Sequence, residues 1–148
     1  MTAADNALLA SQALDFTGKT VLVTGGGVGI GRAIAEAFAG AGAQVVIAEI
    51  DPANADAAEA AMPSARVIRC AMLAERIAAE TGKLDVLVNN VGHFVHARPF
   101  AMLADEEAEE ILDVNLGQLL RMTKAMVPLL RKGAPGSSII NVTSIEAH

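Results

Sequence analysis

Residues 21–31 read Val21-Leu22-Val23-Thr24-Gly25-Gly26-Gly27-Val28-Gly29-Ile30-Gly31, an apolar run that passes into a glycine-rich turn. The spacing Gly-x-x-x-Gly-x-Gly differs from Gly-x-Gly-x-x-Gly and lacks the lysine and hydroxyl residue of a P-loop. Glycine lets a turn be tight and lets a ligand lie against bare backbone. A helix that begins there offers unpaired N–H groups to a pyrophosphate. The stretch therefore predicts a phosphate-binding strand-turn-helix, with a purely structural turn as the alternative.

The size and composition of the chain predict one globular domain. The chain has 148 residues, of which 53% are hydrophobic, enough for a real core. Its apolar runs are broken by Gly, Asp or Glu and fall short of the ~20 residues of a transmembrane helix. Residues 1–16 contain no Lys or Arg, so they are interpreted as an N-terminal tail rather than a secretory signal. Residues 17–148 form the predicted domain.

The net charge excludes some classes of binding partner, and the cysteine content indicates the cellular compartment. A net charge of -6 argues against nucleic acid or an anionic membrane surface as a partner. Cys70 is the single cysteine, which excludes an internal disulfide and favours a reducing compartment, the cytoplasm.

Apolar runs alternate with helical patterns along the chain. Strands are predicted over residues 20–24, 44–50, 65–70, 84–90 and 138–142, and helices over 30–39, 51–61, 71–81 and 105–132. This alternation predicts an α/β fold, a doubly wound parallel, Rossmann-like sheet of about five strands in the order 3-2-1-4-5 with flanking helices. Ligands of such sheets bind at the carboxyl edge, where residues 25–31, Glu49, residues 89–92 and Ser144 converge. The connection over residues 71–83 leaves almost no loop, so it is either strained or merely compact.

Glu49 ends the second predicted strand, 18 positions after Gly31. This is close to the ~20 positions expected for an acid that accepts hydrogen bonds from an adenosine ribose. A carboxylate there repels a 2′-phosphate, and neither the glycine turn nor the residues directly after Glu49 supply a compensating Arg or Lys. NAD is therefore predicted over NADP, with a solvated acid at a strand end as the alternative.

Together, four segments resemble the classical short-chain dehydrogenase/reductase family. They are Thr24-Gly25-Gly26-Gly27-Val28-Gly29-Ile30-Gly31, Asn89-Asn90-Val91-Gly92, Asp113-Val114-Asn115-Leu116 and Asn141-Val142-Thr143-Ser144. Their order and spacing also match the family, and Val91 replaces the family's alanine.

The resemblance implies a role for each segment. The first holds the NAD pyrophosphate through Thr24, Gly25, Gly27, Gly29, Ile30 and Gly31. Asn90, Val91 and Gly92 support the sheet and the adenosine side of the cofactor. Asn115 orders a water in a proton relay, and Ser144 hydrogen-bonds the substrate oxygen. The implied activity is NAD-dependent interconversion of a small secondary alcohol and a ketone, by a homo-oligomer (dimer or tetramer) in the complete form.

Two departures from the family affect this interpretation. The segment after the third strand is shorter by about ten residues. The chain also contains no tyrosine, so the family's catalytic Tyr-x-x-x-Lys pair, expected after Ser144, is absent, and the sequence is interpreted as truncated after the catalytic serine. A noncatalytic NAD-binding fragment or remnant is the alternative function. A different nucleotide-using α/β enzyme is a third hypothesis, because fold alone does not determine function.

Other candidate sites are weak. A nucleophilic pair of Ser144 and His148 lacks a third member and an oxyanion hole. His93, His96 and Cys70 lack the paired spacing of zinc ligands, so no metal site is predicted. Five apolar residues of the long helix serve either the core or a subunit contact, and the sequence does not divide them: Leu112, Leu116, Leu119, Leu120 and Met126.

Overall fold

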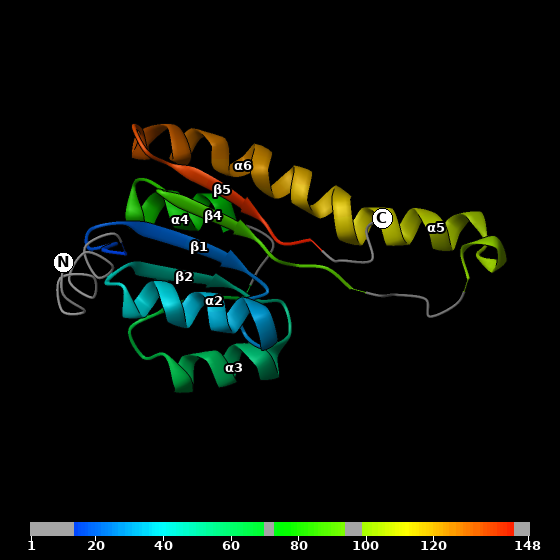
Figure 1. The fold of residues 1–148 in the computed structure, drawn as a ribbon, viewed down its shortest axis with the longest axis horizontal. Helices are drawn as coiled ribbons and strands as arrows, with labels where there is room; N and C mark the ends of the chain where they lie inside the picture. The colour runs from blue at the N-terminus through cyan, green and yellow to red at the C-terminus, as the bar shows by residue number, and fades with distance from the viewer. Residues whose placement is uncertain (1–13, 70–72, 94–98, 144–148) are drawn as a thin grey trace, which may run out of the picture.

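The computed structural model describes residues 14–69, 73–93 and 99–143 (Figure 1). Its strands are β1 (Thr20–Thr24), β2 (Gln44–Ala48), β3 (Arg66–Ile68), β4 (Val86–Asn89) and β5 (Ser138–Asn141). Its helical elements are α2 (Gly29–Gly40), α3 (Pro52–Ala61), α4 (Leu73–Thr81), the short 3-10 helix η1 (Phe100–Met102), α5 (Asp105–Leu112), the π-helical turn η2 (Asp113–Gly117) and α6 (Gln118–Gly133). All pairs in the sheet are parallel and the order is β3-β2-β1-β4-β5, which confirms the predicted fold class.

The sheet is covered on both faces, as its continuous apolar strands require. Alternate residues of β1 point to opposite faces. Leu22 packs in one cluster with α4 and α6, and Val21 and Val23 pack in the other with α2 and α3. Figure 1 shows these two helix layers on either side of the sheet. The central strand is therefore buried completely.

The strand ends differ from the predictions by one or two residues. β2 ends at Ala48 instead of residue 50, so Glu49 lies just beyond the strand, and β3 covers only Arg66–Ile68 instead of residues 65–70. The Asp51 side chain caps α3 by accepting from the Asn54 N–H (2.9 Å), and Pro52 is the first helical residue. The chain from α4 to β4 is short, since α4 ends at Thr81 and β4 begins at Val86. Residues 70–72 of the predicted tight connection lie outside the described residues, so its strained or compact character stays a prediction.

The predicted long helix over residues 105–132 contains a π-helical turn, η2, between α5 and α6. One wider turn shifts every later residue around the helix axis relative to an unbroken α-helix. No helix within residues 14–69, 73–93 and 99–143 is both apolar enough and long enough to span a membrane.

Asp85 is a buried carboxylate at the edge of the sheet where β1 and β4 begin, opposite the edge where these strands end. Its side chain is 2% exposed and accepts hydrogen bonds from the Thr20 N–H (2.9 Å) and from Lys19 Nζ (3.3 Å), and it pairs with Lys83 Nζ (2.8 Å). Burial opposes its ionisation, but the hydrogen bonds from Lys83, Thr20 and Lys19 outweigh it and lower the pKa of Asp85. The charged form therefore stabilises the folded state.

Asp85→Asn is expected to make the stability of the fold less dependent on acid pH. Because the pKa of Asp85 is lower in the folded state, its contribution is complete above the unfolded value of about 4 and is lost as the pH falls through the folded value. We expect Asp85→Asn to lower the free energy of unfolding by about 1 kcal/mol at pH 7 and to leave it unchanged at pH 3. Urea unfolding across this range measures it, with the exposed Asp56→Asn as the control. Parallel stability curves for wild type and Asp85→Asn would contradict this expectation.

Candidate functional site

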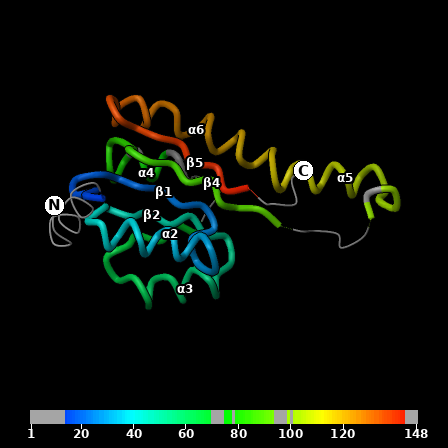
Figure 2. The backbone as a smooth tube through the Cα atoms, viewed as in Figure 1, coloured from blue at the N-terminus to red at the C-terminus, as the bar shows by residue number. Residues whose placement is uncertain are grey.

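The carboxyl ends of β1, β2 and β4 bring the predicted cofactor-binding segments together. Thr24 at the end of β1 aligns with Ala48 of β2, and Val23 aligns with Val88 of β4. The tube in Figure 2 shows the chain leaving these three neighbouring strands at one edge of the sheet. The glycine turn, Glu49 and residues 90–92 therefore share that edge, as the topology predicts.

The glycine turn needs glycine for conformation at two positions, and at three others, Gly26, Gly27 and Gly31, an added Cβ would come closer than 3.0 Å to a neighbouring atom. Gly25 and Gly29 have φ values of 61° and 55°, a region that L side chains rarely adopt. A Cβ at Gly31 would overlap the Gly25 carbonyl oxygen and the Asn90 amide. A Cβ at Gly27 would lie 2.6 Å from Glu49 Oε2. The turn, residues 25–31, therefore packs closely on its neighbours with bare backbone, and it is called the glycine cradle below.

The amino terminus of α2 opens directly from this turn. No side chain caps it, and its first turn contains no acidic residue. The backbone N–H groups and the positive end of the helix dipole therefore face no protein carboxylate from that turn. This arrangement suits an anionic group such as a diphosphate.

Glu49 contacts the turn as well as its own strand end. The residue is 8% exposed. Its Oε2 accepts from the Gly27 N–H (3.1 Å), and its Oε1 accepts from the N–H groups of Ile50 (3.0 Å) and Asp51 (3.1 Å). A carboxylate has about four acceptor positions, so these bonds leave one of them free. The solvated-acid interpretation is therefore wrong for Glu49.

Thr24 and Asn90 join the turn to the end of β4. The Asn90 amide donates to the carbonyls of Thr24 (3.1 Å) and Gly25 (3.2 Å). The Thr24 hydroxyl accepts from the N–H groups of Asn90 (3.0 Å) and Val91 (3.3 Å) and donates to Val88 O (3.3 Å). These hydrogen bonds fix the glycine turn against residues 89–92 at the end of β4.

Asn115 lies within the π-helical turn and holds the segment after β4. Its amide donates to the carbonyls of His93 (3.0 Å) and Ile111 (2.9 Å), and its Oδ1 accepts from the His93 N–H (3.0 Å). The Cβ of any residue at Gly92 would lie 3.1 Å from the same oxygen. Asn115 and Gly92 are thus brought to the predicted site, while a role for Asn115 in ordering water stays a prediction.

Apolar side chains are exposed around the same edge. Val28 directly precedes α2, Ile30 lies in its first turn, and Ile50 and Val91 lie just beyond β2 and β4; all four are exposed. Exposed apolar side chains next to a polar cradle suit a ligand that combines flat aromatic rings with phosphates.

Several predicted residues lie outside the described part of the chain: Cys70, His96, Ser144 and His148. The predicted role of Ser144 and the nucleophilic pair therefore remain untested. Among the described residues, no group of three His, Cys, Asp or Glu side chains is placed to hold a metal ion.

Sequence reasoning missed three side-chain contacts near this edge. Gln118 donates to Val91 O (2.9 Å), and the Asn89 amide donates to Thr123 Oγ1 (3.1 Å) and to Asn141 Oδ1 (2.9 Å). Asn89 and Asn141 are register partners on adjacent strands, a pairing that the predicted strand order could have revealed. Gln118 depends on the π-helical turn, for which the sequence holds no clear signal.

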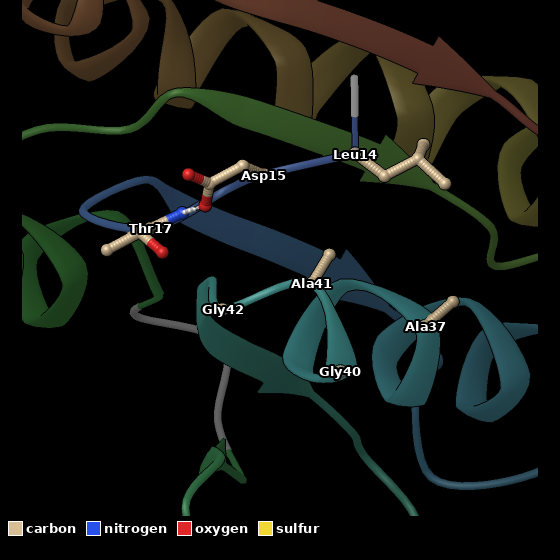
Figure 3. A pocket seen from close by; sticks show the side chains of 7 residues that line it. All are labelled: Leu14, Asp15, Thr17, Ala37, Gly40, Ala41 and Gly42. Carbon is tan, nitrogen blue, oxygen red and sulfur yellow. Dashed lines mark hydrogen bonds between the residues drawn. The ribbon is translucent and has the colours of Figure 1, made fainter. Parts of the chain in front are cut away.

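A hollow lies at the opposite edge of the sheet, between the segment before β1 and the end of α2 (Figure 3). Its lining is mostly small residues and backbone, and its carboxylate, Asp15, already accepts from the Thr17 N–H (2.9 Å). It has no convergent polar groups directed at a ligand, so the carboxyl edge remains the candidate site.

Comparisons with known proteins agree with this geometry. The sequence profile described as "short chain dehydrogenase" matches residues 19–148. The chain is 35% identical to L-fucose dehydrogenase of Bos taurus over 138 residues, which cover 88% of this chain and 50% of that protein. It is 36% identical to galactitol 2-dehydrogenase of Agrobacterium fabrum over 135 residues, which cover 85% of this chain and 52% of that protein. The chain thus spans about half the length of these curated relatives.

A solved structure is similar over nearly the whole chain. The crystal structure of 2-keto-3-deoxy-D-gluconate dehydrogenase from Streptococcus agalactiae superimposes with a TM-score of 0.78 at 26% sequence identity. The match covers 93% of this chain and 56% of that one.

Proposed function

The chain belongs to the short chain dehydrogenase family, and from this premise we propose that the protein is an NAD-dependent oxidoreductase. Its substrate in this proposal is a small secondary alcohol or the corresponding ketone. In support of this substrate class, the relatives reported above are named for a sugar, a sugar alcohol and a keto acid. We also propose that it acts in the cytoplasm as a homo-oligomer.

The observation that carries the proposal is the glycine cradle at the uncapped amino terminus of α2. Gly27 and Gly31 let the turn pack closely on Glu49 and Asn90, whereas Gly29, at the start of α2, has no neighbouring atom within 4 Å of an added Cβ. The backbone at Gly29 is therefore open to a ligand, and the helix terminus favours negative charge. The residues present fit a dinucleotide with its diphosphate at this turn.

Glu49 supports NAD over NADP. Its carboxylate is held at the end of β2 by three backbone N–H groups and has one acceptor position left for a ribose hydroxyl. A 2′-phosphate in the same place would meet a negative charge that the protein cannot move without breaking these bonds. No basic residue directly follows Glu49 to balance that charge.

The nicotinamide cofactor would supply hydride transfer, and the chain's own residues would bind the cofactor and orient it. In this proposal Asn90 and Thr24 keep the cradle rigid, and Asn115 holds the backbone of His93 beside it. Ser144 is proposed to hydrogen-bond the substrate oxygen. The proton that the alcohol loses, or the ketone gains, cannot be transferred by a tyrosine among these 148 residues, because they contain none.

A second candidate function for these 148 residues is dinucleotide binding without turnover. The proposed binding residues Thr24, Glu49 and Asn90 lie in the described part of the chain, so binding can be proposed from the described residues alone. Binding and turnover must therefore be measured separately.

We expect the 148-residue chain to bind NADH with at least about tenfold preference over NADPH. Isothermal titration calorimetry measures both affinities, and NADH formation from NAD with galactitol and L-fucose measures turnover. Binding without turnover would support the second candidate. Absence of binding to either dinucleotide by a folded chain would contradict both candidates.

A further inference from the structure

Polar side chains connect the first half of the long helix to the carboxyl edge of the sheet. No residue of α5 or of η2 is buried, and the buried residues of α6 all lie in its second half. Of the predicted core-or-contact residues, Met126 thus belongs to the core, whereas three leucines are exposed: Leu112, Leu116 and Leu120. Figure 1 shows α5 extending beyond the sheet. Asn115 and Gln118 instead bond to the backbone of the segment that follows β4.

Gln118 bonds the residue of this segment that lies against the glycine cradle. Its amide donates to the Val91 carbonyl oxygen (2.9 Å), and the Val91 N–H donates to the Thr24 hydroxyl (3.3 Å). A Cβ added at Gly25 would lie 3.1 Å from Val91 Cγ2, so the valine side chain packs close to the backbone of that glycine. Val91 is nevertheless 39% exposed. The sheet and the long helix therefore hold it from two directions, while part of it remains open at the candidate site.

The peptide that Gln118 holds is followed by a residue that restrains it little. Gly92 comes next, and glycine permits a wide range of backbone angles. The following bonds along the chain are those between Asn115 and the backbone of His93. Loss of the bond from Gln118 would therefore let the peptide between Val91 and Gly92 rotate, and the Val91 side chain would shift relative to Gly25.

We propose that Gln118 is a positioning residue of the dinucleotide site, which acts by holding Val91 against the glycine cradle. The proposal rests on the proposed function, because its ligand is the dinucleotide. An apolar side chain that is already fixed has little freedom left to lose when a flat ring packs on it, whereas a mobile one must first be ordered. Gln118 therefore raises the affinity through Val91 instead of through a bond of its own to the ligand.

Gln118→Met tests the role of the amide, because methionine has a similar length and no N–H donor. NADH is expected to bind about fivefold more weakly, the factor that one net hydrogen bond contributes. Urea unfolding is expected to give the wild-type free energy, since the bond lies at the surface. Lys124→Met, at an exposed position of the same helix, is the matched control and is expected to change neither quantity.

Gln118→Lys restores a donor and is expected to recover most of the lost affinity. Calorimetric titration at raised salt keeps the general attraction between the added charge and the diphosphate small. A lysine variant that binds NADH as weakly as Gln118→Met would show that the donor is not what matters, and it would overturn the proposal.

A double-mutant cycle tests the route through Val91. If Gln118 acts by holding the valine side chain, Gln118→Met is expected to cost little affinity in the Val91→Ala variant, since the side chain to be held is gone. Equal losses of affinity in the two backgrounds overturn this route.

Amide hydrogen exchange tests the same route without a ligand. The N–H groups of Asn90 and Val91 both bond to Thr24, and both are expected to exchange faster in Gln118→Met than in the wild type. Unchanged exchange at these two amides overturns the proposal even where the affinity falls. A wild type and a Gln118→Met variant that bind NADH equally overturn this proposal alone, whereas a folded wild type that binds no dinucleotide overturns the proposed function as well.

Discussion

Gly31→Ala is expected to lower the free energy of unfolding by about 3 kcal/mol and to abolish measurable NADH binding. The added methyl group would overlap the Gly25 carbonyl oxygen and the Asn90 amide. One of these is backbone, and the other is held by hydrogen bonds to Thr24 and Gly25. Neither can move without opening the contact between the glycine turn and β4, so the strain must deform the cradle itself.

Gly40→Ala is the matched control for this change. Gly40 belongs to the same helix, a methyl group added to it would meet no neighbouring atom within 4 Å, and the residue does not require a positive φ. Alanine there is expected to be neutral or to stabilise the helix by about 0.5 kcal/mol. Chemical denaturation and calorimetric titration with NADH measure both variants. Equal stability and affinity for the two would show that the turn tolerates a side chain and would remove the main support for the cradle.

The sheet could be predicted because its strands are apolar on both faces. The runs at residues 20–24 and 44–48 are almost entirely apolar in their interiors, so helices must cover them on both sides. Strand ends are harder to predict, because around β3 only two apolar residues stand between Arg66 and Arg69, and the strand pairs with only one neighbouring strand. The order of strands follows from right-handed crossovers together with the family resemblance.

The meeting of the glycine turn, Glu49 and Asn90 at one edge of the sheet could be predicted, but the bonds between them could not. Chain topology alone brings Glu49 and Asn90 to the glycine turn. The hydrogen bond from the Gly27 N–H to Glu49 depends on the rotamer of Glu49 and on how closely Gly27 approaches that side chain. Sequence spacing specifies neither. The π-helical turn at Asn115 likewise accompanies bonds between Asn115 and His93, which lie far apart in the sequence. Such contacts depend on tertiary packing, so local patterns do not encode them.

Glu49→Gln is expected to destabilise the fold by about 2 kcal/mol and to remove the preference for NADH over NADPH. The wild-type carboxylate accepts three backbone N–H groups, from Gly27, Ile50 and Asp51. A glutamine side chain has one oxygen and one NH₂ group, so whichever way it is placed, the NH₂ group faces at least one N–H donor. That donor is left buried without an acceptor, and if it belongs to Gly27, the turn also loses its bond to the end of β2.

The two effects of Glu49→Gln have separate causes and can be distinguished. Loss of an acceptor lowers stability and weakens NADH binding, whereas loss of the negative charge selectively improves NADPH binding, because a 2′-phosphate is no longer repelled. Glu36→Gln is the matched control: Glu36 pairs with Arg32 on the exposed surface of α2 (2.8 Å), so both stability and cofactor preference are expected to stay near the wild type. Titration of each variant with NADH and with NADPH gives the preference as a ratio that is insensitive to the fraction of unfolded protein. If Glu49→Gln is destabilised but keeps the wild-type ratio, Glu49 supports the turn without selecting the cofactor, and the proposed specificity for NAD is wrong.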